Sequence, residues 1–273
     1  MNRIANLLVT LAAASVLTLP AVAETREAAT VDTREAATLT QALTVLRELQ
    51  AIPDQRVPDL LLAKAEGIII LPANVKVGLI FGARFGNGVM LVRDEDRSWS
   101  NPVFVSTGGG SWGFQAGGQV SDIVLVLTTR DSVEGITDGK LTLGADASVA
   151  AGPVGRTAMA GTSVTFDAEV YAYSKSQGLF AGVSLEGGGI FIAKKANRRF
   201  HGTDSAAAIL ANRAPAPAPA PELVAEVAKI TSGAHGAVAE KAVAEPAQPA
   251  AAPAEAKTYP LPDPEPGKEP SGN

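Results

Sequence analysis

The most constraining feature of this chain is a glycine-rich, β-patterned block that runs from Lys64 to Gly202. It contains 23 of the 27 glycines in the sequence. A glycine inside a strand weakens that strand, because it costs backbone entropy on folding and offers no side chain to pack. So many glycines in strand-like sequence predict close backbone approach, bulges or sharp bends. We therefore expect a strongly curled sheet, built from a block that contains few residues suited to catalysis.

The segments on either side of this block differ from it in composition. Residues 1–23 combine a basic start, an apolar run and a small-residue motif, which predicts a signal peptide cleaved near Ala23. Residues 24–37 are predicted to be a polar spacer. Residues 213–273 hold 12 of the 18 prolines with much alanine and glutamate, and are predicted to be disordered. The folded domain is then expected over residues 38–212, in a protein that is exported to the periplasm or secreted.

Hydrophobic periodicity predicts the fold class. Apolar residues recur at helical spacing from about Thr38 to Ala51, and a second short helix is predicted from Pro58 to Ala65. From Gly67 the period becomes two, and the Asn-Gly step in Gly86-Asn87-Gly88 predicts a hairpin turn. A short helix is expected after Gly202. The prediction is an α+β domain with a mainly antiparallel, barrel-like sheet, two N-terminal helices and one short C-terminal helix.

Three motifs resemble chemical sites, and each has a simpler interpretation. Gly108, Gly110 and Gly113 have dinucleotide-fingerprint spacing but run into strand-patterned sequence, which favours a glycine-rich sheet corner. Ser111 fits a nucleophile-elbow pattern with His201 as its sole candidate base, so a hydrolase is the least favoured hypothesis. The acidic run 94–96 could ligate Ca²⁺, but a solvated turn is favoured. We therefore predict a non-enzymatic protein without a cofactor or a metal site.

Charge and cysteine content limit the other classes of function. The chain has no cysteine, which excludes a thiol nucleophile and a cysteine metal site. Its net charge of −5 argues against a general nucleic-acid binder. One basic cluster stands out against this background, formed by Lys194, Lys195, Arg198 and Arg199. These residues are candidates for contact with anionic lipid head groups, and the alternative is a solvated strand end.

The glycine-rich block resembles the SYLF domain family over residues 60–202. The resemblance rests on motifs in a fixed order: AEGIIILP at 65–72, WSNP at 99–102, LGADAS at 143–148 with GPVGR at 152–156, YAYS at 171–174, and GLFAGVSLEG at 178–187. Within them, the residues expected to form the structural signature of the family are Trp99, Pro102, Asp146, Gly152, Pro153, Gly155, Arg156, Gly178, Phe180, Gly182 and Glu186. For Asp146, we expect either bonds from backbone N–H groups or a pair with Arg156.

The resemblance implies a binding protein. In eukaryotes the family is known as a phosphoinositide-binding and actin-binding module, and it is widespread in exported bacterial proteins. It implies that this chain is an envelope protein that binds lipid or an anionic membrane surface. The alternative is a protein-interaction or scaffold module related to the actin-binding role, with an envelope protein as partner and residues 213–273 as a spacer.

Overall fold

A computed structural model describes residues 33–53, 55–78, 81–112, 117–154, 166–176, 179–182, 185 and 187–244. The predicted signal peptide and the last part of the predicted disordered tail lie outside these ranges. None of the helices in the described part of the chain is long and apolar enough to cross a membrane.

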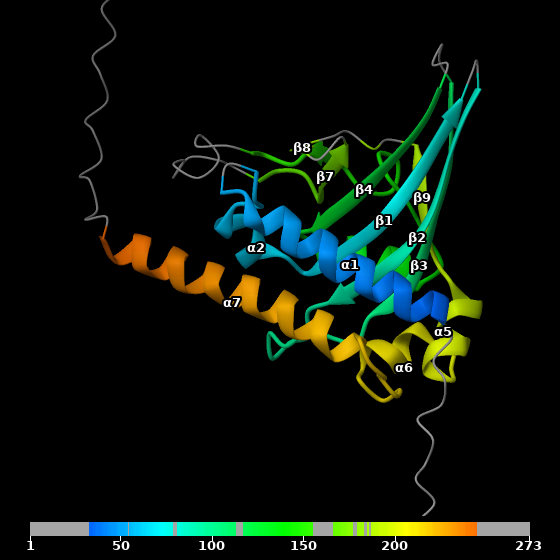
Figure 1. Ribbon diagram of the computed structural model, residues 1–273. Helices are drawn as coiled ribbons and strands as arrows, with labels where there is room; N and C mark the ends of the chain where they lie inside the picture. Colours follow the sequence, from blue (N-terminus) through cyan, green and yellow to red (C-terminus); the bar gives the residue numbers. More distant parts are fainter. Residues whose placement is uncertain are drawn as a thin grey trace, which may run out of the picture.

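A strongly curled sheet of nine strands forms the centre of the molecule (Figure 1). The strands run in the order β5-β9-β3-β2-β1-β4-β7-β6, with β8 beside β7. Neighbouring strands are antiparallel, except for β6 and β7. The strands are β1 (Gly67–Gly78), β2 (Phe81–Val92), β3 (Val103–Trp112), β4 (Gly117–Leu127), β5 (Lys140–Thr142), β6 (Val149–Ala151), β7 (Val170–Ser176), β8 (Leu179–Gly182) and β9 (Gly188–Ile192). This architecture confirms the predicted fold class.

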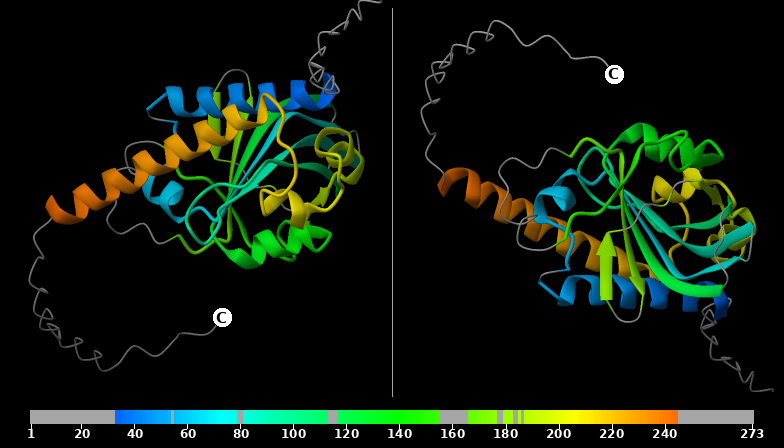
Figure 2. Two further views of the ribbon diagram at one scale, coloured as in Figure 1. Left: turned by 90° about the horizontal axis from the view of Figure 1, so that it is seen from below. Right: turned by 90° about the horizontal axis from the view of Figure 1, so that it is seen from above.

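Helices lie on both sides of the sheet (Figure 2). On one side, α1 (Thr33–Ala51), α2 (Asp59–Lys64) and α7 (Ala220–Ala244) enclose the larger apolar core. On the other side, α3 (Arg130–Thr137) covers a second core formed with β5. The remaining helices, α5 (Lys194–His201) and α6 (Ala206–Leu210), lie next to the beginning of β3. Because helices cover both faces of the central strands, these strands carry continuous apolar runs.

The beginning of α1 differs from the sequence-based prediction. Helix α1 begins at Thr33, so the spacer predicted at 24–37 is wrong for its last five residues. Glu35 in this first turn is buried, which a spacer residue would not be. Helix α3 begins after Thr129, whose side chain accepts a hydrogen bond from the backbone N–H of Ser132. Such a cap satisfies an amide that the helix itself leaves unpaired.

The predicted disorder is wrong for residues 220–244, which form the 25-residue helix α7. Helix α7 packs against α1 and α2, and it buries Leu223 and Val227 completely. Alanine-rich sequence forms helices readily, and the apolar residues of α7 fall on one face. The predicted domain boundary at 212 is therefore too early, because the C-terminal helix shares the core of the sheet.

The predicted turn at Gly86-Asn87-Gly88 is also wrong, because these residues lie inside the continuous strand β2. Strand β1 bulges beside them, with register shifts between Ile70 and Val75 toward β2. A Cβ atom on Gly88 would lie 2.1 Å from the carbonyl oxygen of Ile70. The glycines are therefore needed for close approach of the bulged backbone and not for a turn.

Candidate functional site

The four basic residues of the predicted cluster lie on helix α5, and two of them form ion pairs within the fold. Arg198 pairs with Asp204, and Arg199 pairs with the buried carboxylate of Glu35, to which its Nε donates at 3.1 Å. The Arg198 guanidinium lowers the pKa of Asp204 through its hydrogen bond and its charge. Lys194 and Lys195 are exposed, and neither takes part in the ion pairs that Arg198 and Arg199 form.

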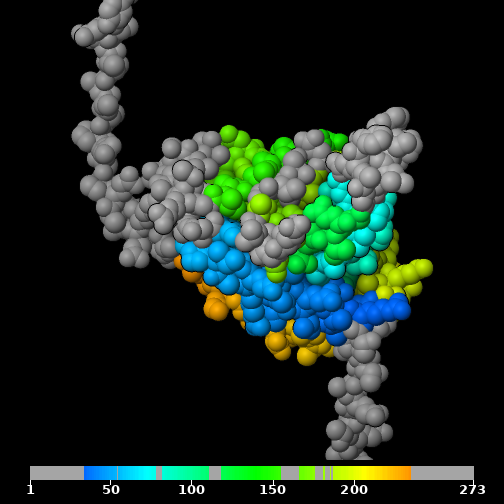
Figure 3. Space-filling view, turned by 45° about the horizontal axis from the view of Figure 1, so that its top comes forward, coloured from blue at the N-terminus to red at the C-terminus, as the bar shows by residue number. Residues whose placement is uncertain are grey.

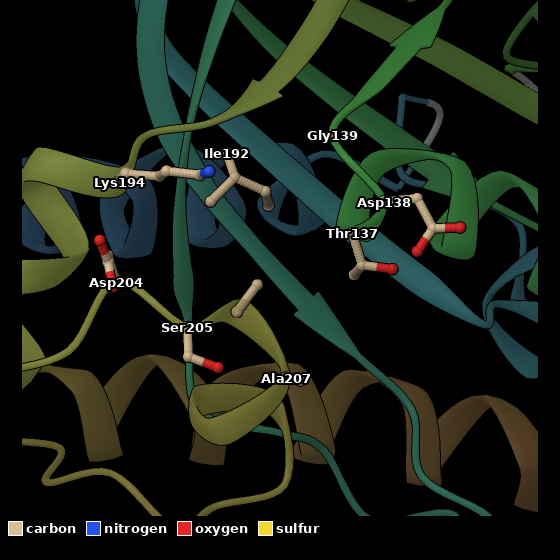
Figure 4. A pocket seen from close by; sticks show the side chains of 9 residues that line it. Thr137, Asp138, Gly139, Ile192, Lys194, Asp204, Ser205 and Ala207 are labelled. Atoms are coloured by element: carbon tan, nitrogen blue, oxygen red, sulfur yellow. The ribbon is translucent and has the colours of Figure 1, made fainter.

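A cleft of about 450 Å³ lies beside α5, between α3 and α6 (Figure 4). Lys194 extends over it, and the carboxylates of Asp138 and Asp204 stand at its edges. One cation between two carboxylates does not favour an anionic ligand. The cleft is therefore a poor candidate for binding a lipid head group.

Trp99 is buried and ties α7 to the sheet. Its indole Nε1 donates a hydrogen bond to Oγ1 of Thr231 on α7 at 3.0 Å. The guanidinium of Arg93, itself only 1% exposed, lies 4.7 Å from the Trp99 ring centroid. The pKa of Arg93 is lowered to about 10, mainly by burial and also by the charge of Arg97, while the charge of Glu66 opposes this shift. This cluster stabilises the fold and presents no open stacking platform.

Pro102 and His201 meet at the beginning of β3. Nε2 of His201 lies 2.8 Å from the Pro102 carbonyl oxygen, and Nδ1 lies 2.6 Å from that of Pro215. Ser111 is nine residues further along the chain, or about 30 Å along an extended strand. Its backbone therefore lies far beyond hydrogen-bond reach of His201, which removes the basis of the hydrolase hypothesis.

The remaining signature residues lie on short strands and turns. Asp146 is exposed and accepts the backbone N–H of Thr142 at 2.6 Å, which lowers the pKa of Asp146. Gly152 faces the ring of Tyr173, whose hydroxyl donates to the Pro153 carbonyl oxygen at 3.2 Å. Phe180 and Gly182 belong to β8. Gly155, Arg156, Gly178 and Glu186 lie outside the described residues, as does the alternative pair of Asp146 with Arg156.

The other motifs have structural surroundings that differ from those of chemical sites. Gly108 and Gly110 lie within strand β3, whereas a dinucleotide fingerprint needs a helix directly after the glycines. In the acidic run, Asp94 accepts the backbone N–H of Glu95, and Asp96 accepts that of Ser98, each at 2.9 Å. These bonds belong to an exposed turn.

An uncovered apolar surface lies where β1, β2 and β4 extend beyond the helices. Val75 is the register partner of both Phe85 and Val120, so these three side chains lie side by side on one face. Val77 follows two residues later on that face. Phe85 is 52% exposed, Val120 61% and Val77 41%. We call Val75, Val77, Phe85 and Val120 the apolar patch.

The strands that carry the apolar patch reach the surface of the molecule. In Figure 3 the cyan and green atoms of the strands reach the surface beside the blue helix α1. Along β2, Phe85 lies on the same face as Val89, which is buried in the core beneath α1. The patch is therefore the uncovered continuation of a buried sheet face. The period-two spacing of Val75 and Val77 was a signal in the sequence, because it is typical of the apolar face of a strand.

The reverse face of the same strand ends is cationic. Lys76 is the register partner of Arg84, and Gln119 is the partner of Lys76 on β4. In the described part of the chain, neither Lys76 nor Arg84 makes an ion pair or a hydrogen bond. Burial lowers the pKa of Arg84 from its usual value. Sequence analysis missed both residues, because Lys76 and Arg84 are eight positions apart in the sequence and become neighbours only through strand register.

These observations define the class of protein. The fold is an α+β domain whose curled sheet is covered by helices over its inner part and open at its strand ends. Its distinctive surface residues are apolar and cationic, which suits binding. Within the described residues, no group of three or more histidine, aspartate or glutamate side chains could hold a metal ion.

Comparisons with known proteins identify the family. The sequence model of the Ysc84 family, described as "Las17-binding protein actin regulator", matches residues 108–230. LAS seventeen-binding protein 3 of Saccharomyces cerevisiae is 40% identical over 170 residues, which are 61% of this chain and 37% of that protein. Human SH3 domain-containing YSC84-like protein 1 is 40% identical over 190 residues, or 67% of this chain and 55% of that protein.

This chain carries a domain of the Ysc84 (SYLF) family. SH3 domain-containing YSC84-like protein 1 of Xenopus laevis is 39% identical over 170 residues, or 60% of this chain and 50% of that protein. The matched region spans about half the length of the vertebrate relatives and less of the yeast relative. The family match extends from β3 into α7, in agreement with the packing of that helix in the domain core.

Proposed function

We propose that this protein is a non-enzymatic, exported binding protein whose Ysc84 domain contacts a lipid membrane surface through the apolar patch. The observation that carries the proposal is the exposure of Phe85, Val77 and Val120 on one face of adjoining strands. Clustered apolar side chains of this kind mark contact sites for proteins or membranes, whereas scattered ones do not. The cations on the reverse face favour a negatively charged membrane.

Helix α5 has a secondary role in this proposal. Only Lys194 and Lys195 remain for head groups, since Arg198 and Arg199 are engaged with carboxylates. Asn197 of α5 accepts a hydrogen bond from the backbone N–H of Phe104 on β3. Phe104 lies four residues before Gly108, which is the register partner of Phe85. That separation is about 13 Å along β3. Because this separation exceeds the Debye length of about 8 Å at physiological ionic strength, the two lysines add attraction to the contact of the apolar patch mainly at low ionic strength.

A vesicle experiment tests the proposed contact. The mature protein is expected to float with phosphatidylcholine vesicles in which about a third of the lipid is phosphatidylglycerol. Changing Phe85 and Val120 together to serine is expected to weaken partitioning by about tenfold or more, because their apolar area no longer leaves water. Partitioning is measured by flotation over a series of lipid concentrations.

Ile52 provides the matched control. It is 37% exposed, lies next to the end of α1 and is outside the apolar patch. Ile52→Ser is expected to partition like the unchanged protein. Equal binding by the Phe85/Val120 variant, or an equal loss in Ile52→Ser, would show that the apolar patch is not the contact surface.

The second candidate function is a protein-interaction module, favoured by the family description and by the name of the yeast relative. The structure changes how this candidate must be tested. Because α7 belongs to the domain core, a spacer role is confined to the residues after Ala244. Pull-down of envelope proteins by the full chain and by a chain ending at Ala244 distinguishes a partner of the tail from a partner of the domain.

A further inference from the structure

The cleft beside α5 is lined by charges of both signs. Lys194, the first residue of α5, extends over the cleft, and Asp138, which caps the C-terminal end of α3, stands on the side of α3 (Figure 4). Within the described residues, neither of these two side chains makes an ion pair or a hydrogen bond. The third charge, on Asp204, is balanced by an ion pair with Arg198. The described part of the cleft thus offers a ligand one cation and one anion.

Both of these charges stand at a helix end where their sign is unfavourable. The N-terminal end of a helix carries partial positive charge and the C-terminal end partial negative charge. Lys194 nevertheless begins α5, whose first turn contains no acidic residue and whose N-cap, Ala193, makes no side-chain hydrogen bond. Asp138 ends α3, whose last turn contains no basic residue. Charges placed against this preference are expected mainly at functional or strained sites. An anion beside Lys194 and a cation beside Asp138 are each attracted by the side chain and by the helix end together.

The rest of the lining includes an apolar surface. It is formed by Ile192 at the end of β9 and by Ala206 and Ala207 at the beginning of α6. The volume of about 450 Å³ is within the usual range of small-molecule sites, about 300–1,000 Å³. Because the charges at the cleft balance, a ligand of a single sign is repelled by one side as it is attracted by the other. The best fit is a small molecule with a carboxylate, an ammonium and an apolar group.

We propose that this cleft binds a small zwitterion of the amino-acid type, as a free amino acid or as a short peptide with an apolar side chain. The carboxylate of the ligand pairs with Lys194 at the beginning of α5, its ammonium pairs with Asp138 at the end of α3, and its side chain packs against Ile192. We refer to these three residues as the zwitterion site. The inference does not depend on the proposed membrane contact, because the apolar patch is formed by the outer ends of β1, β2 and β4.

Titration of the mature protein with leucine and with analogues that lack one charge tests this pairing. N-acetyl-leucine lacks the ammonium, and leucine amide lacks the carboxylate. Leucine is expected to bind about five- to tenfold more tightly than either analogue, because each analogue loses one charge-assisted hydrogen bond. Binding is followed by NMR through the backbone amide signals of Gly139 and Ala207, which line the cleft. The same titration with leucyl-leucine shows whether a single amino acid or a peptide is the better ligand.

Two variants assign each charge of the ligand to its partner. Lys194→Gln is expected to lower affinity for leucine about five- to tenfold without lowering affinity for leucine amide, which has no carboxylate to pair. Asp138→Asn is expected to lower affinity for leucine to a similar extent without lowering affinity for N-acetyl-leucine. Lys195→Gln and Asp131→Asn are the matched controls, because they remove the same charges from the same helices outside the cleft. Both controls are expected to bind like the unchanged protein, and circular dichroism checks that each variant is folded.

The outcomes separate a zwitterion site from surface charges without a ligand. If neither leucine nor leucyl-leucine shifts the signals of Gly139 and Ala207 up to its solubility limit, the inference is wrong. It is also wrong if both analogues bind as tightly as leucine, or if the controls lose as much affinity as the two cleft variants. The membrane contact is tested separately, by vesicle flotation of the Phe85/Val120 variant, so either proposal can fail while the other stands.

Discussion

Gly152 and Tyr173 show how strongly a single residue of the family signature is constrained. A Cβ atom on Gly152 would lie 2.3 Å from the ring of Tyr173. That ring cannot move aside easily, because Tyr173 is completely buried between the sheet and the helices. The same burial raises the pKa of its hydroxyl. The requirement for glycine at this position is therefore steric.

Changing Gly152 to alanine is expected to lower the free energy of unfolding by about 1–3 kcal/mol, the usual cost of overpacking a core. Urea unfolding followed by fluorescence measures the loss. Gly233→Ala is the control, since nothing lies within 4 Å of a Cβ atom there and the residue is inside α7. The control is expected to gain up to about 1 kcal/mol from helix propensity. A Gly152→Ala protein as stable as the original would contradict the steric explanation.

Asp146 gives the fold a pH dependence at acid values. Its pKa is lowered by the backbone N–H of Thr142, so the folded protein binds this proton less tightly than the unfolded chain. The resulting stabilisation is complete above the unfolded pKa of about 4 and is lost as the pH falls through the lower folded value. Asp146→Asn is expected to lower the urea midpoint at pH 7 and to approach the unchanged protein near pH 3. A difference that does not vary with pH would exclude this charge effect.

At the scale of elements, α7 is the part of the domain that sequence analysis placed outside it. Its alanine-rich composition and its neighbouring prolines resemble a disordered tail, and only tertiary contact reveals its apolar face. Leu223 and Val227 pack into the core beneath α1 and α2, and Thr231 bonds to Trp99. Helix α7 is therefore a structural element of the domain.

A chain that ends at residue 212 is expected to be less stable than one that ends at Ala244. Loss of Leu223 and Val227 alone removes about 3–6 kcal/mol of burial free energy, at about 1.5–3 kcal/mol for each side chain. The thermal midpoints of the two truncated proteins, measured by calorimetry, test this. The longer chain should match the full-length protein. Equal midpoints for both truncations would mean that α7 does not stabilise the domain.

At the scale of the whole molecule, the fold could be predicted from the sequence more completely than the site. Period-two patterning and clustered glycines were sufficient for a curled antiparallel sheet. The turn at Gly86-Asn87-Gly88 was not predictable, because a glycine needed for backbone approach and a glycine needed for a turn have the same local sequence. The basic residues of α5 were conspicuous in sequence, yet Glu35, 164 positions before Arg199, neutralises one of them. Lys76 and Arg84 become a pair only through strand register.

The bulge of β1 has a consequence for how this domain can diversify. Its register shifts toward both β2 and β4 fall at the boundary between strand segments that build the core and strand ends that remain uncovered. Substitutions beyond the bulge alter the apolar patch or the cationic reverse face at Lys76 and Arg84 without disturbing the packing before it. The sequence of the strand ends can therefore change independently of the core. Members of one family could in this way acquire different ligands on an unchanged scaffold.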